Sequence, residues 1–146
     1  MLRIALIALL LPVSAIAQSR RMQMLETFDA ENFGKYQNEG RTIVIQFHSD
    51  SCSLCKQQER ALKRFAREKD PTTPTFFQAI LGVHGSLGML YNAKPSTMLV
   101  FRGNRLVGKE TGVTSADAIR ELIVKSVMKS RGLPRPRPKR KFKPKR

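Results

Sequence analysis

Runs of apolar residues, some continuous and some at helical spacing, divide the first half of the chain into alternating strands and helices. Residues 26–33 predict a short strand that leads into a helix with Asp29 as its N-cap, and this helix should end near Gly40. Residues 42–47 are almost all β-branched or apolar, which is typical of a central strand covered on both faces. Residues 55–68 are good helix formers with apolar side chains at helical spacing, so they predict a second helix.

The pattern in the second half begins with two helix breakers and a strand. Pro71 and Pro74 should end the second helix, because proline lacks the N–H group that a helix interior needs. Residues 76–83 then predict a strand, and residues 87–93 allow a short helix within a glycine-rich stretch.

A hairpin and a final helix complete the predicted domain. Residues 97–101 and 105–110 predict two strands joined by a tight turn. Thr114 or Ser115 should cap the last helix. The apolar stripe of this helix consists of Ala118, Ile119, Leu122, Ile123 and Val127. Alternating strands and helices followed by a hairpin predict an α/β fold, with a central mixed β-sheet flanked by helices on both faces.

Residues 1–17 have the features of a secretory signal. Arg3 supplies a positive charge, residues 4–11 are apolar without interruption, and residues 15–17 have the small-x-small form of a cleavage site. A hydrocarbon core of ~30 Å needs about 20 apolar residues to span it, so an uncleaved membrane anchor is the lesser alternative. We therefore expect a mature domain of residues 18–130 that is periplasmic or otherwise exported, where disulfides persist.

A strongly basic segment follows the predicted domain. Residues 131–146 contain nine of the chain's 27 Lys and Arg residues, four prolines and no acidic residue, and the whole chain has a formal net charge of +16. Such a segment buries too little apolar surface to offset its ordering entropy, so we expect it to be disordered. Its charge should attract an anionic membrane surface or an acidic protein. Nucleic acid is disfavoured, because Phe142 is the segment's only aromatic residue and the expected compartment argues against it.

The chain has two cysteines, Cys52 and Cys55, which form a Cys-x-x-Cys pair between the central strand and the second helix. At a helix start, unpaired backbone N–H groups and the macrodipole favour a thiolate, so thiol–disulfide exchange is the preferred interpretation. A purely structural disulfide would close too short a loop to gain much entropy. A zinc site would need two more ligands, and the chain has only two histidines to supply them.

Residues 25–128 resemble the thioredoxin family. The features that carry this resemblance are a buried strand ending at Phe47, a Cys-x-x-Cys pair that opens the next helix, and a later TMLVFRGN hairpin with a closing helix. The resemblance implies a thioredoxin-like fold and a protein-disulfide oxidoreductase. Cys52 would be the nucleophile that forms the mixed disulfide, and Cys55, more buried and one turn later, would resolve it. No cofactor is expected.

Several positions depart from the thioredoxin pattern. Ser51 stands where the family has tryptophan, and the residues between the cysteines are Ser53 and Leu54. Leu54 offers an apolar face to a partner. Gln46 stands where the family has a buried aspartate that transfers protons to and from the resolving cysteine, and glutamine cannot take a proton. Gln46 is therefore a modulating position: water or another group substitutes, or turnover at Cys55 is slower.

The loop before the hairpin should contact the substrate, as the cis-proline loop does in the thioredoxin family. Ser96 aligns with that proline and Pro95 precedes it, so either the bond before Pro95 is cis or Ser96 occupies the site with an ordinary peptide. The predicted substrate-contact residues are Ser53, Leu54, Pro95, Ser96 and Thr97. His48, four residues before Cys52, either modulates the thiolate or fills the space beside the active-site loop.

The expected function is disulfide exchange with exported proteins. A reductant is favoured over an oxidase, with a redox partner protein, such as a membrane electron donor, that regenerates the dithiol. The chain is expected to act as a monomer. The alternative is a redox-silent thioredoxin-like module that tethers through its basic segment, and deletion of residues 131–146 distinguishes the two, because turnover on a small disulfide should survive the deletion.

Overall fold

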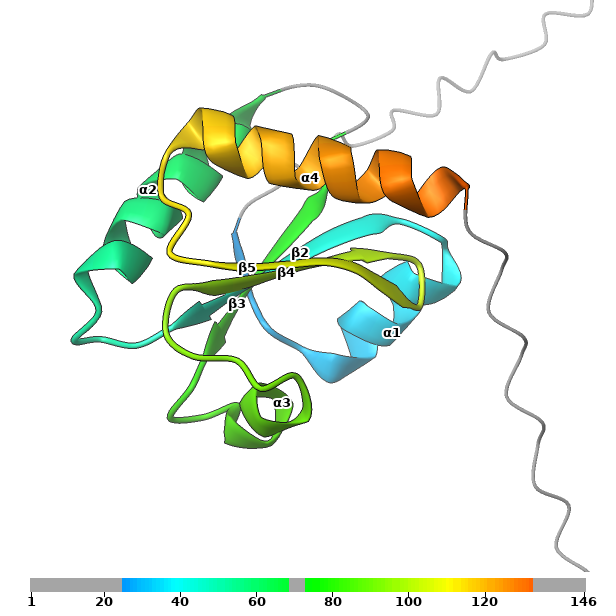
Figure 1. The fold of residues 1–146 in the computed structure, drawn as a ribbon. Coiled ribbons are helices and arrows are strands. Elements are labelled where there is room, and N and C mark those ends of the chain that lie inside the picture. The colour runs from blue at the N-terminus through cyan, green and yellow to red at the C-terminus, as the bar shows by residue number, and fades with distance from the viewer. Residues whose placement is uncertain (1–24, 69–72, 133–146) are drawn as a thin grey trace, which may run out of the picture.

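The computed structural model describes residues 25–68 and 73–132 (Figure 1). Within these ranges the chain forms five strands and four helices. Their bounds are β1 Glu26–Thr27, α1 Ala30–Asn38, β2 Thr42–His48, α2 Ser53–Arg67, β3 Thr75–Ile80, α3 Gly85–Leu90, β4 Thr97–Arg102, β5 Arg105–Thr111 and α4 Ala116–Arg131. The predicted order of strands and helices is confirmed.

The strands form one mixed sheet in the order β1-β3-β2-β4-β5. The strands β1, β3 and β2 are parallel, β4 pairs antiparallel with β2, and β5 pairs antiparallel with β4 in a hairpin. Every residue of β2 after Thr42 is buried, as expected for a central strand covered on both faces. The α/β architecture predicted from the sequence is therefore present.

Two apolar clusters lie on opposite faces of the sheet, because successive side chains of a strand point to opposite sides. On one face, Val44 and Phe76 pack with α2 and α4 residues such as Leu62 and Ile119. On the other face, Phe47 belongs to a cluster that residues of α1 and α3 cover. Figure 1 shows α2 and α4 on one side of the sheet and α1 and α3 on the other.

The helix caps follow the sequence signals. Asp29 caps α1 by accepting a hydrogen bond from the N–H of Asn32 (2.8 Å), and Ser115 caps α4 by accepting one from the N–H of Ala118 (3.2 Å). The strand expected to reach residue 83 ends earlier, at Ile80. It ends there because the Ile80 carbonyl accepts from the N–H groups of residues 83 and 84, which makes a tight turn.

Two details of the last helix differ from the prediction. Ala118 is exposed and does not belong to the buried stripe, whereas Ser126 is buried. The reason lies on β5, where Gly108 lets α4 approach so closely that a Cβ atom at this position would lie 2.1 Å from Ser126 Oγ. The helix also continues through Arg131 to a cap at Gly132, so the first two residues of the expected basic segment (131–146) belong to α4 and its cap.

The predicted signal (1–17) and the rest of the basic segment lie outside the described residues. Among the helices that the structure does describe, none is long and apolar enough to cross a bilayer.

Candidate active site

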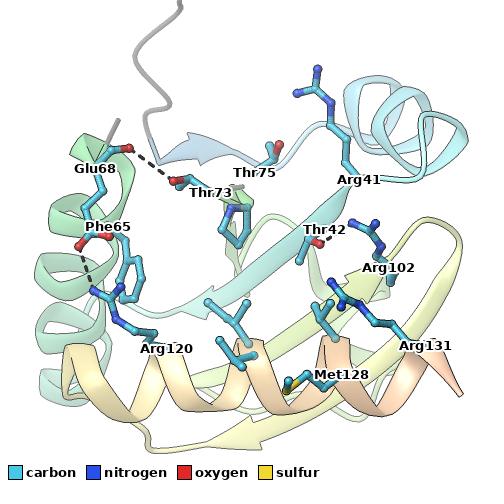
Figure 2. A pocket seen from close by; sticks show the side chains of 14 residues that line it. Arg41, Thr42, Phe65, Glu68, Thr73, Thr75, Arg102, Arg120, Met128 and Arg131 are labelled. Carbon is cyan, nitrogen blue, oxygen red and sulfur yellow. Dashed lines mark hydrogen bonds and ion pairs between the residues drawn. The ribbon is translucent and has the colours of Figure 1, made fainter. Parts of the chain in front are cut away.

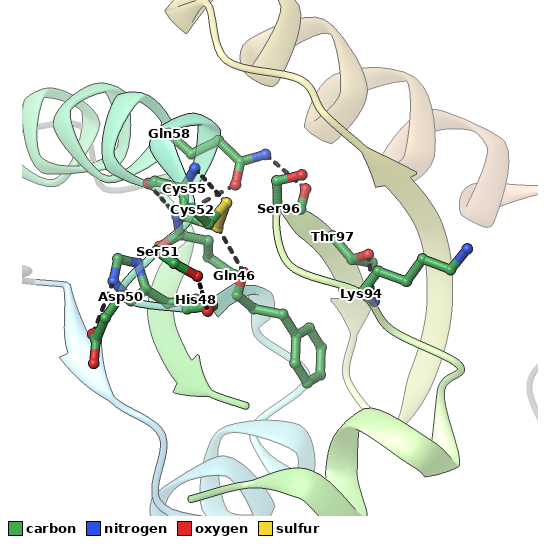
Figure 3. Close-up of a disulfide and its surroundings, with 12 residues drawn as sticks. Gln46, His48, Asp50, Ser51, Cys52, Cys55, Gln58, Lys94, Ser96 and Thr97 are labelled. Atoms are coloured by element: carbon green, nitrogen blue, oxygen red, sulfur yellow. Dashed lines mark hydrogen bonds and ion pairs between the residues drawn. A yellow bond between two sulfur atoms is a disulfide. The ribbon is translucent and has the colours of Figure 1, made fainter. Parts of the chain in front are cut away.

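Cys52 and Cys55 form a disulfide at the start of α2, with an S–S distance of 2.16 Å and a Cα–Cα distance of 5.2 Å (Figure 3). The central strand β2 ends four residues before Cys52, and a turn closed by the Cys52 N–H and the Ser49 carbonyl (3.0 Å) leads into the helix. Cys52 is the N-cap of α2, and its Sγ accepts a hydrogen bond from the Cys55 N–H (3.0 Å). A sulfur in this position is stabilised as a thiolate by the helix N-terminus.

The two sulfurs differ in access. Cys52 is half-buried, whereas Cys55 is fully buried, as the sequence predicted. The Cys55 Sγ lies 3.6 Å from the Phe47 carbonyl oxygen, to which a thiol at this position can donate. A substrate can therefore reach Cys52, while Cys55 can reach the Cys52 sulfur from the protein interior.

Gln46 lies beneath the disulfide and is fully buried. Its amide nitrogen donates to the Cys55 carbonyl (2.8 Å) and to the Gln58 Oε1 (3.3 Å), and its Oε1 accepts from the Gln78 amide (3.2 Å). The side-chain amides of Gln46, Gln58 and Gln78 thus lie beneath the disulfide, and none of them exchanges a proton at neutral pH.

Gln58 is a site residue that the sequence reasoning missed. It is fully buried, and its amide nitrogen donates to the Ser96 carbonyl (2.9 Å) and the Val113 carbonyl (2.8 Å). The available signal was its spacing: Gln58 lies one turn after Cys55 and one turn before Leu62, on the stripe of α2 that faces the sheet.

Ser96 occupies the place beside the disulfide, and it does so with an ordinary peptide bond. Residues 25–68 and 73–132 contain no cis peptide, so the alternative of a cis bond before Pro95 is wrong. Ser96 is buried with φ = +64°, and its N–H donates to the same Phe47 carbonyl oxygen that Cys55 Sγ approaches. Pro95 is exposed, one residue earlier.

The loop of residues 94–97 is a tight turn. The Thr97 N–H donates to the Lys94 carbonyl (3.0 Å), and with Pro95 second and a positive φ at Ser96 this is a type II turn. The Lys94 N–H donates to Thr97 Oγ1 (3.0 Å). Because Pro95 has no N–H, every backbone donor of the turn has an internal partner. Backbone pairing with a substrate must therefore use the turn's acceptors.

The other predicted contact residues divide between the surface and the interior. Ser53 and Leu54 are exposed on the first turn of α2, beside Cys52. Thr97 is 1% exposed, and its hydroxyl holds the turn through Lys94 and lies 2.9 Å from Thr111 Oγ1. Thr97 therefore supports the turn from inside.

His48 is the last residue of β2 and is 8% exposed. Its Nε2 lies 3.8 Å from an Asp50 carboxylate oxygen, and its Nδ1 is buried with no hydrogen-bond partner among the described residues. Figure 3 shows the ring turned toward Asp50, on the side of the disulfide away from Ser96. The structure thus brings His48 to the rim of the site.

Glu59 on α2 has a pKa below its ordinary value. The main cause is the hydrogen bond from Lys63; the charges of Lys63 and His48 and a hydrogen bond with Gln78 add to it, and partial burial opposes it. This carboxylate therefore borders the buried amides as a stable anion.

A pocket of about 730 Å³ lies at the opposite end of the sheet (Figure 2). Its lining includes four arginines, Arg41, Arg102, Arg120 and Arg131, and apolar side chains of α2 and α4. Thr42, which also lines it, begins β2, whereas the cysteines follow the end of β2. The pocket is therefore separate from the disulfide. Within the described ranges, no three His, Cys, Asp or Glu side chains gather to hold a metal ion.

Comparisons with known proteins show the fold. No protein-family model matches the chain, and no curated protein sequence matches it. Among solved structures, the chain is similar to Trxlp from Edwardsiella tarda (TM-score 0.60, 20% identity, 68% of this chain and 97% of that one). It is also similar to thioredoxin f2 from Chlamydomonas reinhardtii (TM-score 0.57, 25% identity, 70% and 94%) and to Schistosoma mansoni thioredoxin (TM-score 0.59, 18% identity, 71% and 96%).

Proposed function

We propose that this chain, which has the thioredoxin fold, exchanges disulfides with exported proteins through Cys52 and Cys55 and acts as a reductant. The fold and the Cys-x-x-Cys pair at disulfide distance support a thiol:disulfide oxidoreductase. The observation that carries the proposal is the unequal burial of the two sulfurs at the N-terminus of α2.

The reaction begins when the Cys52 thiolate attacks one sulfur of a substrate disulfide. The other substrate sulfur leaves as a thiolate and takes up a proton, and a mixed disulfide remains on Cys52. Cys55 then loses its proton and attacks Cys52 Sγ, which releases the second substrate sulfur. Two electrons and two protons pass to the substrate, and the chain is left with the disulfide that the structure contains.

The proton of Cys55 must leave without help from Gln46, because an amide is no base at neutral pH. We propose that water or the departing substrate thiolate accepts it. This arrangement predicts slower resolution of the mixed disulfide than a buried carboxylate would give.

The proposed substrate surface consists of Ser53 and Leu54 on one side of Cys52 and Pro95 and Ser96 on the other. Leu54 is 43% exposed, so it offers apolar contact. The Ser96 carbonyl already accepts from Gly112 and Gln58, so the proposed backbone acceptor of the turn is the Pro95 carbonyl.

His48 is the proposed modulator of Cys52, because its buried ring lies at the rim of the site, four residues before Cys52. A nearby charge or hydrogen bond stabilises a thiolate, so His48→Gln should slow the alkylation of Cys52. A rate equal to that of the parent would show that His48 only fills space.

The direction of electron flow is proposed from the resemblance to thioredoxins. Thioredoxin has a potential of about −270 mV, which is that of a reductant, whereas a strong oxidant such as DsbA lies near −120 mV. The proposed redox partner is a membrane electron donor that restores the dithiol.

Export is proposed from the signal-like residues 1–17, and the periplasm is the proposed compartment. The basic residues after Gly132 are proposed to hold the protein near anionic membrane surfaces or acidic proteins. N-terminal sequencing of the protein recovered from cell fractions tests cleavage and location together.

The deciding experiment is a redox titration of the mature protein in graded thiol buffers, with free thiols trapped and counted. We expect a reversible two-electron transition near −270 mV. The Cys55→Ser variant should accumulate a mixed disulfide with its substrate, and Cys52→Ser should not. Thiols that never interconvert would overturn the oxidoreductase, and a transition near −120 mV would overturn the reductant.

A further inference from the structure

Gln58 connects the redox helix to the turn that faces the substrate. We propose that it is a positioning residue, which holds Ser96 in its left-handed conformation beside the disulfide and thereby sets the affinity for protein substrates. This proposal rests on the disulfide exchange proposed above. Figure 3 shows the Gln58 amide directed from α2 to Ser96.

The hydrogen bonds of Gln58 leave it one orientation. Its two amide hydrogens go to the carbonyls of Ser96 and Val113, and its Oε1 accepts from Gln46. A reversed amide would direct an oxygen at two carbonyl oxygens, so the network fixes the assignment. The buried Gln58 side chain therefore hydrogen-bonds from α2 to β2, to the turn before β4 and to the connection between β5 and α4.

Ser96 needs such support, because a residue with a Cβ atom rarely adopts φ = +64°. Its N–H donates to the Phe47 carbonyl, and its own carbonyl accepts from the Gly112 N–H and from Gln58. Strained conformations persist where the surroundings over-determine them. Gln58 is the only one of these three partners that holds Ser96 through a side chain, so its contribution can be removed without touching the backbone.

The consequence for catalysis follows from the place of the turn. The Phe47 carbonyl oxygen accepts from the Ser96 N–H and also lies next to the Cys55 Sγ. The turn and the disulfide are therefore adjacent in the site. A protein substrate must lie against this turn while its sulfur reaches Cys52. A small disulfide needs only the sulfur. Loosening Ser96 should therefore raise KM for proteins and affect small disulfides much less.

The test compares Gln58→Met, which keeps the length of the side chain and removes its hydrogen bonds, with Gln57→Met, the matched change at the exposed neighbour. Turnover on insulin is measured with dithiothreitol as reductant, and the rate constant for 5,5′-dithiobis(2-nitrobenzoate) is measured in a single turnover of the pre-reduced protein with no other thiol present. For Gln58→Met we expect kcat/KM on insulin to fall about tenfold, mainly through KM, and the small-disulfide value to fall less than about threefold. Gln57→Met should match the parent on both substrates.

Rescue separates positioning from general damage. Glycine adopts a positive φ without strain, so adding Ser96→Gly to Gln58→Met should recover most of the lost affinity for insulin. Equal losses on both substrates, or no rescue by Ser96→Gly, would overturn the proposal. If Gln58→Met does not fold, Gln58→Asn, which keeps the amide one methylene short, replaces it in the same comparison. A parent protein inactive on both substrates would instead overturn the proposed function.

Discussion

At the scale of single residues, the disulfide rests on amides where a charged group would be costly. A buried carboxylate without a cation loses its hydration and shifts toward its neutral form. Gln46, Gln58 and Gln78 avoid this cost, because they are neutral and hydrogen-bond one another and backbone carbonyls. These amides beneath the disulfide therefore carry no charge that changes with pH.

This arrangement predicts how Cys52 responds to pH. In the parent, the rate of alkylation of Cys52 by iodoacetamide should follow one titration, that of its own thiol. Gln46→Glu should add a second one, because burial raises the pKa of the new carboxyl and its anion opposes the thiolate. Gln57→Glu, at an exposed position, serves as the control and should give one titration. A single titration in Gln46→Glu would mean that this position does not sense or influence the sulfurs.

The sequence predicted the reactive residues of the site better than the residues that hold them in position. Cys52 and Cys55 were found because a spacing and a helix start suffice to define them. Ser96 was found only as one of two alignments, since sequence alone does not show which residue adopts a positive φ. Gln58 was missed, because its partners, Ser96 and Val113, lie 38 and 55 residues away, and no local pattern records such contacts.

At the scale of elements, α2 carries an ion pair whose effect depends on pH. Glu59 and Lys63 are one turn apart with the acid nearer the N-terminus, which is the favourable order. Because folding lowers the pKa of Glu59, the pair stabilises the fold above the unfolded pKa, and this stabilisation is lost as the pH falls through the folded pKa.

Glu59→Gln should therefore lower the free energy of unfolding at pH 7 by about 0.3–0.5 kcal/mol. As the pH falls through the lowered pKa of Glu59, the difference between variant and parent should shrink. Urea denaturation over a series of acidic pH values measures the difference, with Glu121→Gln, an exposed change on α4, as the control. A deficit that does not change with pH would show that lost packing, and not the ion pair, is responsible.

The contact between β5 and α4 gives a second prediction at this scale. Gly108→Ala places a Cβ 2.1 Å from Ser126 Oγ and 2.9 Å from its Cβ, so the helix must shift. We expect a loss of about 1–3 kcal/mol of stability, the usual cost of overpacking. The penalty should shrink in a Ser126→Gly background, which a thermal-unfolding double-mutant cycle measures. Additive effects would contradict the close approach.

The same contact explains why the stripe of α4 was only partly predicted. Hydrophobic spacing located the helix and its buried Ile119 and Ile123. Spacing cannot show that a glycine on another strand admits Ser126 in place of Ala118. Element order and type follow from local pattern, whereas the rotation of a helix on the sheet depends on contacts between distant segments.

At the scale of the whole molecule, the redox site lies near the start of α4, and the described chain stops just after the other end of this helix. The α4 helix begins beside the site, close to Val113, and its 16 residues span about 24 Å before it ends at Arg131. Arg131 lines the pocket with Arg41, Arg102 and Arg120, of which Arg41 is paired with Glu39 and Arg120 with Glu68 (Figure 2).

The last prediction separates these two ends. A variant that stops at Gly132 loses eight Lys and Arg residues and keeps all of α4. Its turnover on insulin should stay within about twofold of the parent, because the truncation keeps every described residue of the site and all of α4. Its binding to vesicles that contain anionic lipid should be lost, and the parent's binding should weaken steeply as salt is raised. A full-length variant with these eight residues changed to glutamine controls for chain length. Since charge is the proposed cause, that variant should behave like the truncated one; if turnover falls in both, the basic segment belongs to the catalytic unit.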